Sequence, residues 1–112
     1  MKQNYTQVLK AHIALSSTIF PQNTVGSSLD VISRAKLWQL GQDYAHGTGH
    51  GVGHFLNVHE GPQSISQKNN TPLKKDMIVS IEPGFYLEGE YGIRLENLTL
   101  IEETPSLYSN QM

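Results

Sequence analysis

Cysteine is absent from the sequence, and this absence excludes both a disulfide framework and a metal site built on thiolates. Long apolar runs are also absent, since no stretch approaches the roughly 18 residues that a membrane-spanning helix needs. Basic residues are few: the largest cluster is Lys74-Lys75, and the formal net charge is -2. We therefore expect no nucleic-acid partner, no membrane partner and a cytoplasmic location.

The residues that are present suit one small folded domain. The chain has 112 residues, of which 38% are hydrophobic and 16% charged, as is typical of a globular protein. Residues 102–112 are polar and show no periodicity, so they are predicted to form a loose tail. The domain itself is expected to span residues 1–101.

Two helices are predicted in the first part of the chain. Between Gln3 and Ser17 the apolar residues recur at helical intervals, with Val8, Ile13 and Leu15 expected on one face. A second helix should be capped by Ser28 or Asp30 and end at Gly41. Its apolar residues, including Leu37, Trp38 and Leu40, are expected in the core.

Strands are predicted in the second part of the chain. The runs Met77–Glu82 and Gly92–Ile101 are apolar and rich in β-branched residues, which is typical of strands. Turns are expected at Pro83-Gly84 and at Glu88-Gly89-Glu90. Helices followed by strands indicate the α+β class.

A segment rich in histidine and glycine links the two parts. Four of the five histidines lie within fourteen residues: His46, His50, His54 and His59. A helical zinc-protease motif is excluded, because glycine follows the first histidine where that motif needs glutamate. In an extended strand, His46, His50 and His54 would share one face, and the glycines would let the backbone approach a neighbour closely.

Two glutamates lie at positions where a strand should be apolar. Glu82 ends the run Ile78-Val79-Ser80-Ile81 and is expected on the face of Ser80. Glu96 shares a strand face with Arg94, and a buried charge is costly there unless it is paired or bound to metal. Carboxylates together with imidazole favour Mn, Co or Zn in a hydrolytic site. An ion pair between Arg94 and Glu96 is the alternative explanation.

These motifs carry a family resemblance. The segments HGTGHGVGHFLNVHEGP, SIEPGFY and GIRLENLTLI are similar in order and spacing to the pita-bread metallopeptidases of family M24, and most closely to the Xaa-Pro aminopeptidases. The resemblance implies a partial pita-bread fold, in which helices pack on a curved, mostly antiparallel sheet. Residues 1–101 would be the C-terminal portion of the catalytic domain.

The resemblance also implies a metal site and a substrate. His50 and Glu96 would be metal ligands, and Glu82 would be a ligand that also takes the proton of the attacking water. The ion would be divalent, with Mn favoured over Zn or Co, and the complete family site holds two ions. The substrate would be a peptide with proline at its second position.

Three further residues receive roles from the resemblance. His59 would hydrogen-bond the scissile carbonyl, and His46 would line the substrate pocket. Arg94 would contact the metal-bound carboxylates and steady them without binding the metal itself.

Two ligands of the family site lack a counterpart in this sequence. They are a pair of aspartates, and none of Asp30, Asp43 and Asp76 is spaced to form that pair. We therefore expect a fragment that holds at most one metal ion well and that needs an aspartate-bearing N-terminal half. The expected partners are that complementing half or further copies of the chain in a homo-oligomer. The alternative is a non-catalytic remnant or interaction module with the same fold.

Overall fold

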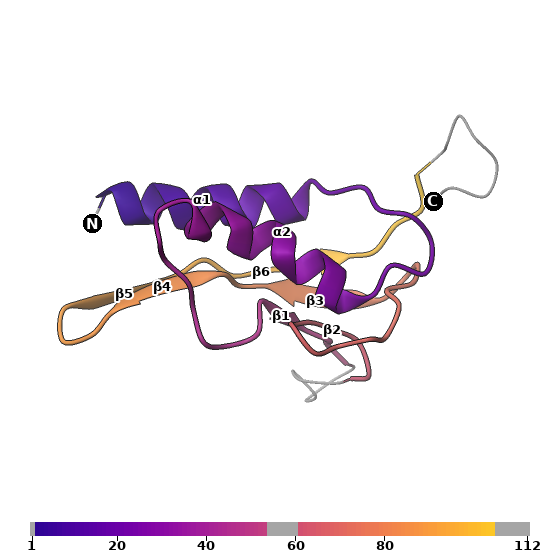
Figure 1. Ribbon diagram of the computed structural model, residues 1–112. Coiled ribbons are helices and arrows are strands. Elements are labelled where there is room, and N and C mark those ends of the chain that lie inside the picture. Colours follow the sequence, from indigo (N-terminus) through magenta and orange to yellow (C-terminus); the bar gives the residue numbers. More distant parts are fainter. Residues whose placement is uncertain (1, 54–60, 105–112) are drawn as a thin grey trace.

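The computed structural model describes residues 2–53 and 61–104, and it places two helices over one side of a group of short strands (Figure 1). The helices are α1, Lys2–Ser16, and α2, Gly26–Trp38. Both predicted helices are confirmed, and both precede the predicted strands. Within the described ranges, neither helix has the length and apolar character needed to cross a membrane.

Helix α1 buries one face against α2 and the strands. Val8, Ala11 and Leu15 are buried, at the spacing of a single helical stripe. Ile13 was predicted on this face and is exposed instead. The reason is geometric, because five residues on from Val8 the side chain points about 140° away from it.

Helix α2 begins two residues earlier than the predicted cap at Ser28. Val25 is the N-cap residue and makes no side-chain capping bond. The first helical residue, Gly26, packs so closely on the strand below that an added Cβ would lie 1.7 Å from the carbonyl oxygen of Ser64. Asp30 was the other candidate cap, but it is a fully buried residue inside the helix.

The C-terminal end of α2 is only partly in the core. Leu37 is fully buried as predicted, whereas Trp38 and Leu40 are exposed. The helix ends at Trp38, and the chain turns at Gly41, which has a φ of 71°. Trp38 and Leu40 therefore point outward because the buried stripe of the helix ends at Leu37.

Among the described residues, six short strands form three antiparallel pairs. Their bounds are β1 Gly49–His50 with β2 Ser64–Ile65, β3 Ile78–Ile81 with β6 Asn97–Leu100, and β4 Gly84–Leu87 with β5 Tyr91–Arg94. A bridge between Gly51 and Val79 joins β1 to the edge of β3 that β6 leaves free. The predicted combination of helices with mostly antiparallel strands is confirmed.

The strand boundaries differ from the prediction in two places. The predicted strand Gly92–Ile101 is two strands, because pairing stops at Leu95 and Glu96 between β5 and β6. Gly84 was predicted in a turn and instead opens β4. The predicted turn at Glu88–Glu90 is confirmed as the tip of the β4–β5 hairpin, where Gly89 has a φ of 78°.

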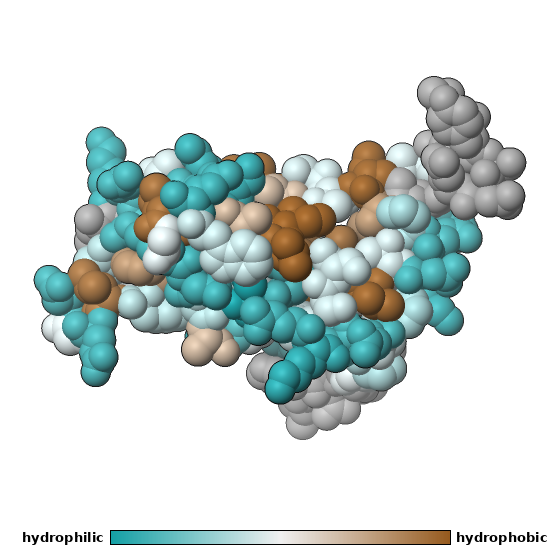
Figure 2. All heavy atoms as spheres, viewed as in Figure 1, coloured by the Kyte–Doolittle hydropathy of each residue, from teal (hydrophilic) through white to brown (hydrophobic). Residues whose placement is uncertain are grey.

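In the part of the chain that the structure describes, two apolar clusters make up the core. The larger one lies between the helices, β2 and β3 and comprises Leu15, Leu29, Ile65, Leu73, Val79 and Ile81. The second lies toward the β4–β5 hairpin and comprises Val8, Leu37, Tyr44 and Ile93. Elsewhere apolar side chains reach the surface in separate patches among hydrophilic residues (Figure 2).

Candidate metal centre

Three side chains from different elements converge beside β3. His50 ends β1, Glu82 directly follows β3, and Glu96 lies in the break between β5 and β6. One donor atom of each lies within 4.8 Å of the other two. His50 Nε2 is 3.1 Å from Glu82 Oε2. The structure thus brings together all three residues that were predicted as ligands, and their role as ligands stays a prediction.

Hydrogen bonds to Ser80 and Thr48 hold this arrangement in place. The hydroxyl of Ser80 donates to Glu82 Oε2 at 2.8 Å and accepts from the backbone N–H of His50 at 3.0 Å. The N–H of Glu82 donates to the carbonyl of Thr48 at 2.6 Å. Ser80 and Glu82 therefore share a strand face, as predicted.

Gly49 allows β1 to lie this close to β3. A Cβ at Gly49 would lie 1.9 Å from the carbonyl oxygen of Ser80, a distance that no real side chain tolerates. At Gly47 the nearest atom to an added Cβ is Ser66 Cβ at 3.5 Å, which is an ordinary contact. The expectation that a glycine marks a close backbone approach is confirmed at Gly49.

Arg94 lies at the rim of the cluster. Its Nη1 is 3.5 Å from Glu82 Oε1, and its Nε donates to the hydroxyl of Tyr86 at 2.7 Å. The hydrogen bond with Tyr86, followed by the nearby carboxylates, raises the pKa of Arg94 above its ordinary value. Within the part of the chain that the structure describes, Arg94 forms its ion pair with Glu82 and not with Glu96.

His46 lies outside the ligand cluster, where two tyrosines hold it. Its Nε2 is 2.8 Å from the hydroxyl of Tyr86, and its ring stacks on Tyr44 with centroids 4.8 Å apart. The predicted strand does not reach back to His46, because β1 begins at Gly49. His54 and His59 lie outside the described residues.

Tyr86 is a site residue that sequence reasoning left undecided. Its hydroxyl accepts from Arg94 and contacts His46, so it connects the rim of the cluster to the histidine segment. A Cβ at Gly92, the partner of Tyr86 across the hairpin, would lie 2.8 Å from the tyrosine ring. A glycine opposite an aromatic residue was the signal available in the sequence, but it required knowledge of the strand register.

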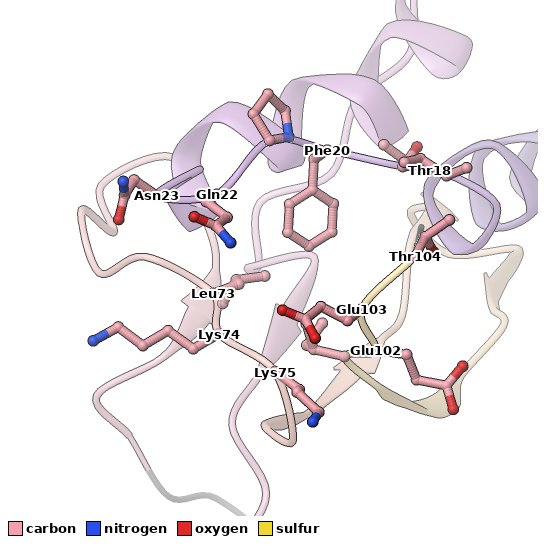
Figure 3. Close-up of a pocket in the computed structure, with 13 residues that line it drawn as sticks. Thr18, Phe20, Gln22, Asn23, Leu73, Lys74, Lys75, Glu102, Glu103 and Thr104 are labelled. Atoms are coloured by element: carbon pink, nitrogen blue, oxygen red, sulfur yellow. The ribbon is translucent and has the colours of Figure 1, made fainter. Parts of the chain in front are cut away.

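A cavity of about 300 Å³ lies apart from the cluster (Figure 3). The connector between α1 and α2, residues 73–75 and the chain after β6 line it, with Phe20 and Leu73 facing its interior. None of the three predicted ligands lines this cavity.

Comparisons with known proteins agree with one another. The sequence profile described as metallopeptidase family M24 matches residues 1–103. A probable Xaa-Pro aminopeptidase P from Laccaria bicolor is 51% identical over 115 residues, covering 98% of this chain and 18% of the relative. Aminopeptidase P1 from Lotus japonicus is 52% identical, covering 96% of this chain and 17% of the relative. The chain thus spans less than a fifth of the length of these curated relatives.

Solved structures resemble the chain in the same way. X-prolyl aminopeptidase from Caenorhabditis elegans, described as a cytosolic enzyme with a di-nuclear active site, has a TM-score of 0.90 and 46% identity. That match covers 97% of this chain and 18% of the solved one. Prolidase from Pyrococcus furiosus has a TM-score of 0.83 and 36% identity, covering 91% of this chain and 30% of the solved one.

Proposed function

Because the chain belongs to metallopeptidase family M24, we propose that it forms one side of the catalytic centre of a metal-dependent aminopeptidase that removes the residue before a proline. The convergence of His50, Glu82 and Glu96, with donor atoms within 4.8 Å of one another, carries this proposal. The names of the matching relatives support the reaction class. Since the chain spans 18% of such a relative, the activity is proposed for an assembly larger than this chain.

The three converging groups fit a divalent cation. One imidazole and two carboxylates, without a thiolate, are a ligand set that Mn²⁺, Co²⁺ and Zn²⁺ accept in hydrolytic sites. We favour Mn²⁺, with Zn²⁺ or Co²⁺ as alternatives, because two carboxylates make the site rich in oxygen. When bound, such an ion supplies Lewis acidity, which makes a water molecule acidic and polarises a carbonyl group.

Glu82 is the residue that we propose moves a proton. Its Oε2 lies beside His50 and accepts from Ser80, while its Oε1 faces Arg94. Arg94 offsets the negative charge of the carboxylate, and Ser80 fixes its orientation. Glu82 would accept a proton from the attacking water and later return it to the leaving amine.

The histidines outside the cluster are proposed to contact substrate. Tyr44 and Tyr86 hold the ring of His46 at the rim of the site, where it would line the pocket for the peptide. His59 is proposed to hydrogen-bond the scissile carbonyl. The substrate class is a peptide with proline at its second position.

By the family resemblance, two aspartates would complete a two-metal site, and none of the described aspartates belongs to the cluster. Asp30 and Asp43 both bind Arg34, and Asp76 is exposed in a turn with a φ of 73°. We propose that an aspartate-bearing segment from outside this sequence completes the site, and that the chain associates with that segment or with a second copy of itself. A cytoplasmic location is proposed as well, supported by the absence of cysteine and by a cytosolic relative.

The first test is a titration of the chain with Mn²⁺, in which isothermal calorimetry measures the binding. We expect one ion to bind, and Glu96→Ala to weaken binding by at least about 100-fold, because it removes a charged ligand. Glu102→Ala, at an exposed glutamate outside the cluster, is the matched control and should bind as the unmodified chain does. Equal binding by all three proteins would refute the ligand assignment.

A second test separates an enzyme from a non-catalytic module with the same fold. The chain is mixed with the aspartate-bearing N-terminal portion of an M24 aminopeptidase and offered a peptide whose second residue is proline. Release of the first residue by the mixture alone is the expected result. Metal binding without any cleavage by the mixture would favour the non-catalytic module.

A further inference from the structure

A buried ion pair lies within α2, beneath the histidine segment. Asp30 is fully buried and Arg34 almost so, and Arg34 Nε donates to Asp30 Oδ2 at 2.6 Å. Burying two charges is unfavourable unless their remaining donors and acceptors are also satisfied. The groups that satisfy them are therefore informative about what the pair does.

The remaining donors of Arg34 bind the segment that leads to β1. Nη1 donates to Asp43 Oδ1 at 2.9 Å and to the carbonyl of Tyr44 at 2.6 Å. Nη2 donates to the carbonyl of His46 at 2.7 Å. The guanidinium also stacks 4.1 Å from the centre of the Tyr44 ring. One planar group thus fixes residues 43–46 at several points.

The second oxygen of Asp30 binds the far end of the same segment. The hydroxyl of Thr48, a fully buried residue, donates to Asp30 Oδ1 at 2.5 Å. The hydroxyl of Tyr44 contacts that of Thr48 and lies 3.2 Å from Ser33 Oγ. Helix α2 therefore holds both ends of the segment 43–48.

Thr48 connects this ion pair to two of the predicted ligands. It lies two residues before His50, and its carbonyl accepts the N–H of Glu82 at 2.6 Å. Its own N–H donates to the carbonyl of Ile65 at 2.9 Å. A shift of Thr48 would therefore move β1 and the start of the Glu82 backbone together.

The charge on Arg34 persists despite its burial. Burial opposes the charged form, but the hydrogen bond and the charge of Asp30 outweigh it, so the pKa of Arg34 is raised. Lysine could not replace it, because a single ammonium cannot span Asp30 and the carbonyls of Tyr44 and His46 in one plane.

We propose that Asp30 and Arg34 are positioning residues, which hold the segment from Asp43 to Thr48 so that His50 faces Glu82. Arg34 binds the backbone carbonyl of His46, and Asp30 binds the side-chain hydroxyl of Thr48, so both residues act through the segment that leads to β1. The effect of Asp30 and Arg34 on catalysis rests on the proposed function. Their linkage to residues 43–48, and through Thr48 to β1 and Glu82, does not depend on it.

Amide hydrogen exchange, measured by NMR on the full chain without metal, tests the linkage. Arg34→Lys and Thr48→Val each remove part of the network, and Thr48→Val keeps the shape of the side chain. We expect exchange at the N–H groups of Thr48, His50 and Glu82 to become at least about tenfold faster, relative to the amides of α1.

Two variants serve as controls. Thr48→Ser keeps the hydroxyl that binds Asp30, and Leu29→Val weakens the core in the same helix without touching the segment. Both should leave the ratio of exchange rates between the segment and α1 unchanged. A uniform increase in Arg34→Lys and Thr48→Val, equal to that in Leu29→Val, would overturn the proposal, because the pair would then serve stability alone.

A parallel titration with Co²⁺ separates this proposal from the proposed function. We expect the visible absorption of bound Co²⁺ to change and its affinity to fall about tenfold in Arg34→Lys and Thr48→Val, but not in the controls. If the unmodified chain bound no Co²⁺, the proposed function would fail, while the exchange rates would still decide the linkage.

Discussion

The two faces of the β3–β6 ladder are built from alternate residues of the same strands, yet their apolar side chains differ sharply in burial. On the face beneath the helices, Val79 and Ile81 are 1% and 3% exposed. On the opposite face, Ile78, Leu98 and Leu100 are 39%, 60% and 52% exposed. This chain therefore covers one face with its own helices and leaves apolar side chains uncovered on the other.

The less covered face is also the one that carries the predicted ligands. Ser80 and Glu82 alternate with Val79 and Ile81 and so belong to the opposite face. Glu96 precedes Leu98 and Leu100 at intervals of two residues, which is the spacing of a shared face. Apolar side chains next to a cluster of metal donors are what a segment that completes the site would cover. The exposed leucines thus support the proposal that further residues dock beside the candidate metal centre.

The largest expected effect comes from truncating a side chain on the covered face. Ile81→Ala should lower the free energy of unfolding by about 3 kcal/mol, through lost apolar burial and the cavity left behind. Leu98→Ala is the matched change on the open face and should cost less than about 0.5 kcal/mol. Urea unfolding of both variants measures the difference.

The two faces would prove equivalent if both substitutions cost the same. In that case Leu98 would be buried in solution by association of two copies of the chain. The unfolding midpoint of the unmodified chain should then rise with protein concentration. A midpoint that does not depend on concentration, together with equal losses, would contradict the exposure of Leu98.

Local sequence patterns anticipated much of the fold because the relevant interactions are local. Periodicity placed both helices and β3, and a glycine between two glutamates marked the turn of the β4–β5 hairpin. The pairing and the exact bounds of the strands were harder to predict from the sequence. The break at Leu95 and Glu96 interrupts an apolar run, and β4 begins at the glycine of a Pro-Gly pair, which otherwise favours a turn.

The candidate site, like the fold, could be predicted from the sequence only in part. The family resemblance pointed to His50, Glu82 and Glu96, and the structure places their donor atoms together. Asp30 was predicted as a helix cap because its partner Thr48 is 18 residues away and invisible to local patterns. Arg34 and Tyr86 were not assigned roles for the same reason, since their contacts depend on how distant segments pack.

Gly49 provides a way to disturb the ligand-bearing face alone. Gly49→Ala should lower the free energy of unfolding by about 2 kcal/mol, because the new Cβ would collide with the backbone of Ser80. His50 follows directly and should be displaced from Glu82. Chemical denaturation and Mn²⁺ affinity measure the two effects.

Gly47→Ala is the control, since its added Cβ makes only ordinary contacts. It should alter stability by less than about 1 kcal/mol and leave Mn²⁺ affinity unchanged. Equal effects of the two substitutions would show that close packing of β1 on β3 is not the reason for the glycine at position 49.

The smallest expected effect concerns the helical side of the molecule, where His12 is buried on α1. Burial lowers the pKa of His12 below its ordinary value of 6.5. The unfolded chain therefore binds a proton more readily than the folded chain does. The contribution of His12 to the free energy of unfolding is therefore most favourable above pH 6.5. It becomes less favourable as the pH falls toward the lowered pKa of the folded state.

His12→Gln removes the ionisable group and should flatten the dependence of the unfolding free energy on pH between 5 and 7. Thr6→Gln places the same side chain at an exposed position of α1 and should retain the dependence of the unmodified chain. Urea unfolding at several pH values measures the slopes. If His12→Gln and Thr6→Gln gave the same slope, protonation of His12 would not be the cause of the lower stability at acid pH. Other ionisable groups would then account for it.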